Sequence, residues 1–363
     1  MYPHQAERLA LAQEAAGVAA LVATTPENVR YVTGFAASTS PDSRVLAVVA
    51  AEKTALVIPE REPGGDGTAD AVIRYPRGDW KAASAALARA LASVTTASGT
   101  IGVDEGDLSP MDWRILTEPL GHGRVVPAAA RFGAARAVKG PYELDRLARA
   151  LAIAEEALNA VLQGLAAGVT EGEAAAVFAR EVAQRGGTPA HVEVTVGERT
   201  ALPAARAGDR ALRAGELIRF DVGCLLDGYH GAVTRTAVLG EPDERQARMS
   251  EALYAGQEAA VRALAPRVTP AHVFGVTMVG VRTSGLPAYQ RHHVGGGIGL
   301  DRDETPTLAP GRHPEIEAGM VLRLQTPYYE PGWGGISGDT TVLVAESEAR
   351  VLNRSHRGLV VLD

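Results

Sequence analysis

A change of pattern near residues 131–141 divides the chain into two regions. Before it, helix-like and strand-like segments alternate, whereas after Gly186 most apolar segments look like strands. A chain of 363 residues is long enough to form two domains with separate cores. We therefore expect a smaller α/β domain over residues 1–130, a linker over 131–141 and a larger α+β domain over 142–363.

The first region has the pattern of an α/β domain. Residues 6–17 (AERLALAQEAAG) predict a helix that ends at Gly17, and residues 79–94 predict a second helix. Residues 44–59 contain two apolar runs separated by the polar residues 52–54, which predicts a β-hairpin.

A long amphipathic helix is predicted at the start of the second region. Gly140 and Pro141 mark its beginning, and apolar residues recur at helical spacing on one face over residues 144–165. Gly168 is expected to end this helix. Residues 170–173 then fit a capping box at the start of a further helix.

The rest of the second region is rich in strands. Two more helices are expected near residues 243–265 and 270–283. The strand-like segments are residues 191–197, 216–223, 232–240, 319–329 and 340–346. Helix pairs beside a mainly antiparallel sheet are typical of an α+β domain.

Charge and composition exclude several classes of function. The formal net charge is −7, and no basic run or basic aromatic strip is present, so we expect no nucleic-acid partner. The N-terminus has neither a basic start nor a long apolar stretch, and no run reaches 18 apolar residues. We therefore expect a cytoplasmic protein without a membrane partner.

The single cysteine, Cys224, cannot form a disulfide within the chain and excludes cysteine-based zinc motifs. It lies in the strand-like run FDVGCLL, so we interpret it as a buried apolar side chain. Asp221 lies in the same run. A carboxylate is costly to bury without a partner, which makes Asp221 a candidate site residue.

Residues 291–300 (RHHVGGGIGL) combine two histidines with a glycine run. The glycines match neither a dinucleotide-binding fingerprint nor a phosphate loop, which favours a bend or a close approach of two backbones. His292 and His293 would point to opposite faces of a strand, so only one of them could face a given pocket.

Several motifs, in order along nearly the whole chain, resemble the pita-bread metallopeptidase family, which includes prolidase, aminopeptidase P and creatinase. The segments that carry the resemblance are residues 26–35 (PENVRYVTGF), 135–150 (ARAVKGPYELDRLARA), 196–242 (VGERT…LGEP), 292–306 (HHVGGGIGLDRDETP) and 317–344 (EAGMVLRLQTPYYEPGWGGISGDTTVLV). The resemblance implies a pita-bread C-terminal domain preceded by a smaller creatinase-like N-terminal domain. It also implies a homodimer.

The chemistry of this family uses two divalent ions that activate a water molecule and are held by two Asp, one His and two Glu. The resemblance places the five ligand positions, in order, at Asp221, Ala232, Gly296, Gln325 and Gly338. Four of the five family ligands are therefore replaced, three of them by residues without a donor side chain. We expect no resident cofactor.

The supporting positions of the family are altered as well. Ala204, Asp303 and Ile336 stand where the resemblance implies His, His and Arg, and only His292 keeps the residue of the family. Asp339 follows Gly338, but on a strand it is expected to point to the other face. Asp221 and Gln325, with Asp303, would hold at most one weakly bound divalent cation.

The replacements favour a metal-free, non-catalytic homologue, or pseudoenzyme, that binds a peptide or small molecule. The alternative is a metal-free, creatinase-like hydrolase in which Asp221, His292, Asp303 and Gln325 form a polar pocket, with His292 as acid or base. An active metal-dependent Xaa-Pro dipeptidase would require shifted ligands at several positions. If the chain is an enzyme, the resemblance implies a hydrolase.

Overall fold

The computed structural model describes residues 1–37, 44–121, 123–311 and 314–362. The chain forms two compact units, Met1–Arg136 and Ala137–Asp363. The division falls inside the segment 131–141 that was expected to be a linker, and helix α5 (Ala129–Ala137) begins just before that segment and extends into it. Within the described ranges, no helix is long and apolar enough to cross a membrane.

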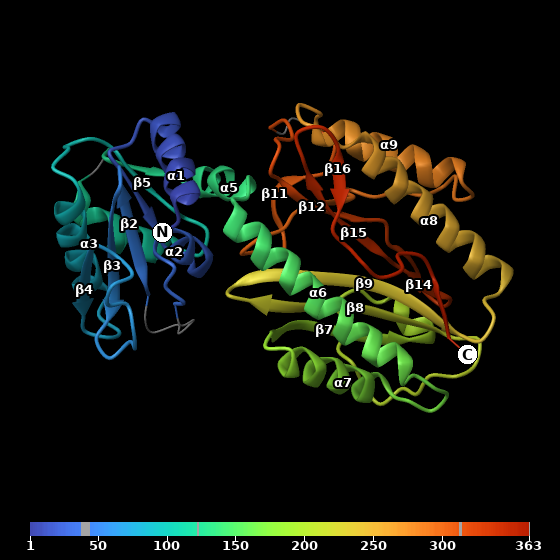
Figure 1. Ribbon diagram of the computed structural model, residues 1–363. Helices are drawn as coiled ribbons and strands as arrows, with labels where there is room; N and C mark the ends of the chain where they lie inside the picture. Colours follow the sequence, from blue (N-terminus) through green and yellow to red (C-terminus); the bar gives the residue numbers. More distant parts are fainter. Residues whose placement is uncertain (38–43, 122, 312–313, 363) are drawn as a thin grey trace. The chain divides into compact units, whose positions relative to one another are not determined.

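The first unit is built on a six-stranded sheet with the order β4-β3-β2-β1-β5-β6 (Figure 1). The strands are β1 (Ala20–Ala23), β2 (Leu46–Ala50), β3 (Lys53–Pro59), β4 (Ala71–Tyr75), β5 (Ile101–Val103) and β6 (Val125–Pro127). The helices are α1 (Pro3–Ala16), α2 (Pro26–Thr33), α3 (Trp80–Val94) and α4 (Pro110–Thr117), and a 3-10 turn spans Glu118–Leu120. The predicted hairpin is confirmed as the antiparallel pair β2–β3, and Gly17 ends α1 in the left-handed conformation.

The second unit contains two main sheets. The first has the order β17-β9-β8-β7 and the second has the order β11-β10-β12-β15-β16. Their strands are β7 (Thr188–Val196), β8 (Leu217–Leu226), β9 (Tyr229–Leu239), β10 (Gly295–Gly297), β11 (Glu304–Thr307), β12 (Val321–Gln325), β15 (Asp339–Val344), β16 (Ala349–Val351) and β17 (Val360–Leu362). A short hairpin joins β13 (Tyr328–Glu330) to β14 (Gly334–Ile336).

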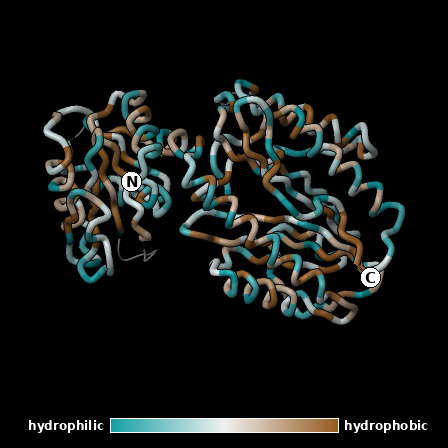
Figure 2. The backbone as a smooth tube through the Cα atoms, in the orientation of Figure 1, coloured by the Kyte–Doolittle hydropathy of each residue, from teal (hydrophilic) through white to brown (hydrophobic). Residues whose placement is uncertain are grey.

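Each of the two main sheets of the second unit is covered by one helix pair. Helices α6 (Pro141–Gln163) and α7 (Glu171–Gln184) pack on β7, β8 and β9 through a core that includes Leu158, Phe178 and Phe220. Helices α8 (Glu244–Ala263) and α9 (Pro270–Thr283) lie together beside the second sheet (Figure 1), and their core includes Met249, Val281 and Leu322. In Figure 2, apolar residues are concentrated on the strands, and the helices alternate between apolar and polar residues along their length.

Local sequence signals predicted the start of α7 correctly, but they misplaced the end of α6. The Thr170 side chain accepts from the backbone of Glu173, and the Glu173 side chain reaches back, so the predicted capping box is confirmed. The predicted end of α6 at Gly168 was wrong, because the helix already ends at Gln163 with Gly164 as its cap. Gly168 lies in the following turn, where its N–H donates to the carbonyl of Leu212.

The glycine run forms the short central strand β10, which confirms the predicted close approach of backbones. Gly295 has a φ of 123°, and a Cβ atom there would collide with the carbonyl oxygen of Arg323. A Cβ atom at Gly297 would lie 2.5 Å from the carbonyl oxygen of Thr305. Glycine therefore lets β10 fit between β11 and β12.

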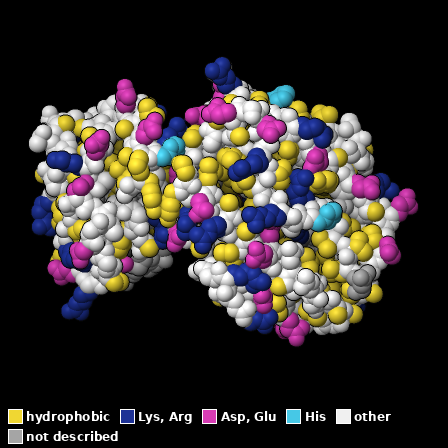
Figure 3. Space-filling view, viewed as in Figure 1, with side chains coloured by type: hydrophobic (Ala, Val, Ile, Leu, Met, Phe, Trp, Pro, Cys, Tyr) yellow, Lys and Arg dark blue, Asp and Glu magenta, His cyan; other side chains and the backbone are white. Residues whose placement is uncertain are grey.

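The surface carries charges of both signs. On the face shown in Figure 3, acidic and basic side chains are interspersed with apolar ones over each unit. A mixed surface of this kind agrees with the modest negative charge of the whole chain.

Candidate functional site

The side chains of β8 alternate between the apolar core and the opposite face of the sheet. Ile218, Phe220 and Val222 pack into the core beneath α6 and α7. Successive side chains of a strand point to opposite faces, so Asp221 points away from that core. Asp221, the carboxylate that was identified as a candidate from the sequence, therefore lies on the face of the sheet that carries no helix.

The same alternation operates in the second sheet. Leu322 and Leu324 of β12 belong to the core shared with α8 and α9, so Arg323 and Gln325 point to the other side. Gln325 is directly opposite Asp339 of β15, and directly opposite residues share a face. The expectation that Asp339 would point to the other face, away from the site, was wrong.

Asp221 is the centre of a polar network that joins both sheets. Its Oδ1 atom lies 3.2 Å from Nε2 of His191 and accepts from Oγ1 of Thr234 at 3.2 Å. Its Oδ2 atom accepts from Nη2 of Arg302 at 2.8 Å. The Asp221 side chain is only 13% exposed, so these partners compensate for its burial.

Arg323 connects Asp221 to Asp339. Its Nη2 atom donates to Asp221 at 3.2 Å and to Oγ1 of Thr234 at 2.7 Å, and its Nε atom donates to Asp339 at 2.6 Å. The Gln325 side chain lies against the same guanidinium, and in the amide orientation that hydrogen bonding favours its oxygen accepts from Nη1 and Nη2. Arg323 is 2% exposed, which makes it a fully enclosed cation.

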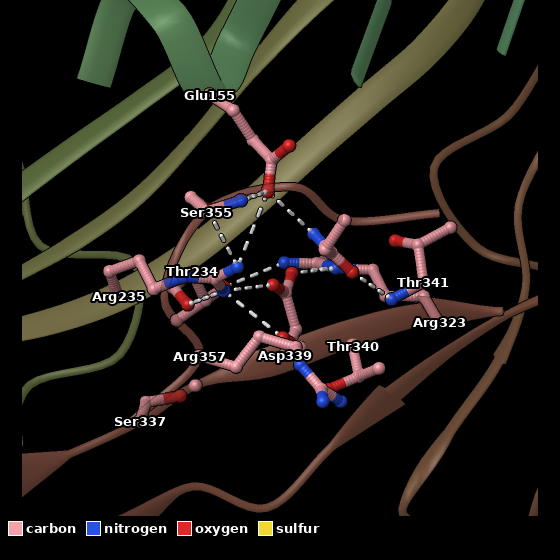
Figure 4. A network of polar contacts seen from close by, with 12 residues as sticks. Glu155, Thr234, Arg235, Arg323, Ser337, Asp339, Thr340, Thr341, Ser355 and Arg357 are labelled. Carbon is pink, nitrogen blue, oxygen red and sulfur yellow. Dashed lines mark hydrogen bonds and ion pairs between the residues drawn. The ribbon is translucent and has the colours of Figure 1, made fainter. Parts of the chain in front are cut away.

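A second buried arginine lies on the far side of Asp339 (Figure 4). Arg235 of β9 donates from Nη1 to Asp339 at 2.8 Å, and its Nη2 atom lies 3.6 Å from Glu155 of α6. The Glu155 carboxylate also accepts from the backbone N–H groups of Arg354 and Ser355. Charged side chains from α6, β9, β12 and β15 are thereby held in one network.

These partners fix the charge states of the site. Burial alone would raise the pKa of Asp221, but the hydrogen bond from His191 and the charges of Arg323 and Arg302 hold it far below its ordinary value. Burial would lower the pKa of Arg323, and the charges of Asp339 and Asp221 raise it instead. Both groups therefore remain ionised at neutral pH.

A further imidazole, that of His230 on β9, lies in the field of His191, Asp301 and Arg302. Burial lowers the pKa of His230 to about 4, so the ring is neutral at pH 7. Its Nδ1 atom is buried and has no hydrogen-bond partner within the described residues.

Two of the residues proposed from the sequence as pocket residues, His292 and Asp303, lie outside the network. His292 and its neighbour His293 precede β10 and are exposed, because the strand begins only at Gly295. Asp303 is also exposed, although its charge acts on Arg323. In the part of the chain that the structure describes, neither His292 nor Asp303 hydrogen-bonds to Asp221.

Three residues of the network, His191, Arg302 and Arg323, were not predicted from the sequence as site residues. Arg323 carried a usable signal, because a charged residue between Leu322 and Leu324 in an apolar strand requires a buried partner. His191 and Arg302 gave no comparable signal, since their proximity to Asp221 depends on how strand and turn are brought together in three dimensions.

The five positions that the family resemblance assigns to metal ligands do not present the donors for two divalent ions. Ala232 is buried and apolar, and Gly296 and Gly338 have no side chain. Asp221 and Gln325 both face Arg323 rather than an open space. Across the described residues, no three His, Cys, Asp or Glu side chains are grouped so that they could hold a metal ion.

Cys224 is buried among the apolar residues beneath α6 and α7, as predicted. Burial raises the pKa of its thiol to about 11, so the thiolate is scarce at neutral pH. This residue contributes packing and no nucleophile.

Comparison with known proteins gives a consistent result over the whole chain. The model of metallopeptidase family M24 matches residues 145–346, and the model of the creatinase/prolidase N-terminal domain matches residues 5–138. A protein named probable dipeptidase PepE from Mycobacterium tuberculosis is 31% identical, and the match covers 98% of this chain and 96% of that protein.

Two solved structures are similar to this chain over nearly its whole length. Dipeptidase PepE from Mycobacterium ulcerans has a TM-score of 0.84 at 29% identity, with 99% of this chain and 97% of that chain covered. The Xaa-Pro dipeptidase from Bacillus anthracis has a TM-score of 0.86 at 22% identity and covers 99% of each chain, which supports the fold alone. The chain therefore belongs to metallopeptidase family M24 and carries a creatinase/prolidase N-terminal domain ahead of the pita-bread domain.

Proposed function

We propose that this chain is a metal-free, non-catalytic member of the M24 family that binds a peptide or small molecule at the Asp221 site. The relatives described above are named as peptidases, so the proposal depends on what distinguishes this site. The observation that carries it is the guanidinium of Arg323, which is buried between Asp221 and Asp339.

The charge balance of the network supports a metal-free state. Its three carboxylates, Asp221, Asp339 and Glu155, are paired with three guanidinium groups, which belong to Arg302, Arg323 and Arg235. A peptidase centre of this family instead uses an excess of carboxylates to offset two dications. Adding a dication to a balanced buried network would require the displacement of an arginine.

The accessible edge of the network is where a ligand would bind. Arg302, His191 and Asp221 have side chains that are 26%, 16% and 13% exposed, whereas Arg323 is enclosed behind them. A guanidinium, an imidazole and a carboxylate together can recognise the charged ends or the amide groups of a short peptide.

Metal analysis and a peptidase assay test the proposal together. The purified chain is equilibrated with manganese, cobalt or zinc, desalted and analysed for bound metal, and it is assayed against Xaa-Pro dipeptides and longer peptides beside an active Xaa-Pro dipeptidase. We expect no stoichiometric metal and no turnover. About two ions per chain together with turnover would contradict the proposal.

A second candidate function is a metal-free hydrolase, and one contact favours it. The His191 imidazole lies 3.2 Å from Asp221, an arrangement in which a carboxylate orients a histidine for acid–base chemistry. In this second candidate, His191 would act as the acid or base in place of His292.

Metal-stripped protein can be screened with amidino and small amide substrates to test this second function. Turnover that is lost in His191→Ala and retained in His292→Ala would establish the hydrolase and overturn the non-catalytic assignment. The exposed His292 is the matched control, because it shares the residue type and lies outside the Asp221 network.

A further inference from the structure

We infer that Arg323 is a built-in cation that joins Asp221 to Asp339, and that its removal will turn the polar centre of the second unit into a divalent-cation site. The inference rests on the proposed metal-free state of the natural chain. It goes further, because it assigns the proposed metal-free state to the Arg323 side chain as well as to the absence of ligand side chains.

The contacts of Arg323 are those of a cation at the centre of an oxygen cage. Its donors reach a carboxylate oxygen of Asp221, a carboxylate oxygen of Asp339 and the hydroxyl of Thr234. The side-chain oxygen of Gln325 completes the set. Four oxygens from four strand positions thus surround one positive charge.

Removal of the guanidinium would leave these oxygens without their common partner. Two carboxylates and two neutral oxygens form a hard donor set of the kind that Mn²⁺, Mg²⁺ and Ca²⁺ prefer. Arg302 still pairs with Asp221 and Arg235 still pairs with Asp339, so part of the negative charge would remain compensated. We therefore expect one ion per cage and a modest affinity, with a Kd of about 0.1–1 mM.

The residue opposite Arg323 adds no side chain to the cage. Gly296 of β10 is the residue directly opposite Arg323 of β12 and contributes no side chain to that position. A shorter residue at 323 would therefore free the volume of the guanidinium next to the carboxylates. Water or a hydrated ion can enter a polar space of this kind, since it offers several hydrogen-bond partners.

The decisive experiment compares the full-length chain with Arg323→Ser in a manganese titration followed by thermal unfolding and by the electron paramagnetic resonance of free Mn²⁺. Without metal, Arg323→Ser should unfold roughly 10 °C below the natural chain, because it leaves buried carboxylates unpaired. Millimolar Mn²⁺ should raise the Tm of Arg323→Ser by about 5 °C and leave the natural chain unchanged.

Two control variants locate the effect. Arg323→Lys keeps a positive charge in the cage and should show no manganese-dependent shift. Arg323→Ser/Asp339→Asn removes one carboxylate and should lose most of the gained affinity for manganese.

A rescue experiment tests the cage in another way. Ethylguanidine, which supplies the missing group from solution, should raise the Tm of Arg323→Ser and not that of Arg323→Lys.

Arg323→Gln is the second test variant, because its neutral amide still donates to the carboxylates and supports folding where serine does not. A folded Arg323→Ser or Arg323→Gln protein without any manganese-dependent shift would overturn the inference while leaving the proposed function intact. Stoichiometric metal and peptidase activity in the natural chain would instead contradict the proposed function itself.

Discussion

Arg323 and Arg235 are both almost completely buried, and both donate to Asp339. Enclosing a charge is costly, and the cost is recovered only when the opposite charges and hydrogen bonds are all in place. Removal of any one member of the network is therefore expected to lower the stability of the fold strongly. The intact network itself contributes little stability compared with a well-packed apolar core of the same volume.

Asp339→Asn tests this sensitivity. The substitution removes the negative charge between the two arginines, so we expect it to lower the free energy of unfolding by about 3–5 kcal/mol. Urea denaturation measures the change. Glu244→Gln is the control, because Glu244 is 95% exposed and 3.9 Å from Arg248, and its loss should cost no more than about 0.5 kcal/mol. Equal effects of the two variants would contradict the buried network.

His230 gives a prediction about acid stability. Its folded pKa of about 4 lies below the ordinary value of 6.5, so the unfolded chain takes up the proton first. The stability contributed by the neutral ring is complete above pH 6.5 and is lost as the pH falls toward 4.

We expect the natural chain to lose roughly 3 kcal/mol of stability over this pH range through His230, and His230→Asn to lose less. Urea denaturation at a series of pH values measures the difference, with the exposed His272→Asn as control. Parallel pH profiles for the natural chain and His230→Asn would show that the ring is not held neutral.

The lowered pKa of Asp221 affects stability in a different pH range. Its contribution to the free energy of unfolding is present above about pH 4 and is lost below it.

The residue scale also shows how far the sequence could predict the site. Asp221 was found because a carboxylate in an apolar strand needs partners, and the structure supplies them. The same reasoning applied to β12 would have found Arg323. His292 could not be placed from the sequence, because its assignment to a strand depended on where β10 begins.

At the scale of elements, the short strand β10 depends on its glycines. Gly295 has a left-handed φ, and a side chain there would meet the backbone of β12. Helices and strands with clear periodicity were predicted close to their observed ends. The early end of α6 was missed because Gly164 and Gly168 give the same local signal and tertiary packing chooses between them.

Two glycine-to-alanine substitutions distinguish backbone strain in β10 from helix propensity in α9. Gly295→Ala should destabilise the chain by about 2–4 kcal/mol, because both the φ angle and the space are unfavourable. Gly275→Ala in α9 should stabilise it by up to about 1 kcal/mol, since nothing lies within 4 Å of its added Cβ atom and alanine favours helix. Thermal unfolding compares the two, and a tolerated Gly295→Ala would refute the close approach.

At the scale of the whole molecule, each of the two units has its own core. In the first unit, Val22, Val48, Leu87 and Val103 belong to one apolar cluster that lies entirely within Met1–Arg136. The two-domain organisation was visible in the sequence as a change of periodicity. The site was harder to predict, because its members come from two sheets that are distant along the chain.

The first unit should fold by itself. A fragment of residues 1–136 contains all six strands of its sheet, so we expect cooperative urea unfolding and a far-ultraviolet circular dichroism spectrum of a mixed α/β protein. The natural chain provides the reference. A fragment that is disordered in the absence of denaturant would show that the first unit depends on the second.

A crystal structure of the natural chain grown in manganese chloride, with anomalous diffraction recorded near the manganese absorption edge, tests directly whether the Asp221 site is free of metal. We predict that the Arg323 guanidinium lies between Asp221 and Asp339 and that no anomalous peak is found beside Asp221. A pair of strong anomalous peaks bound to Asp221, with Arg323 displaced from the carboxylates, would contradict it.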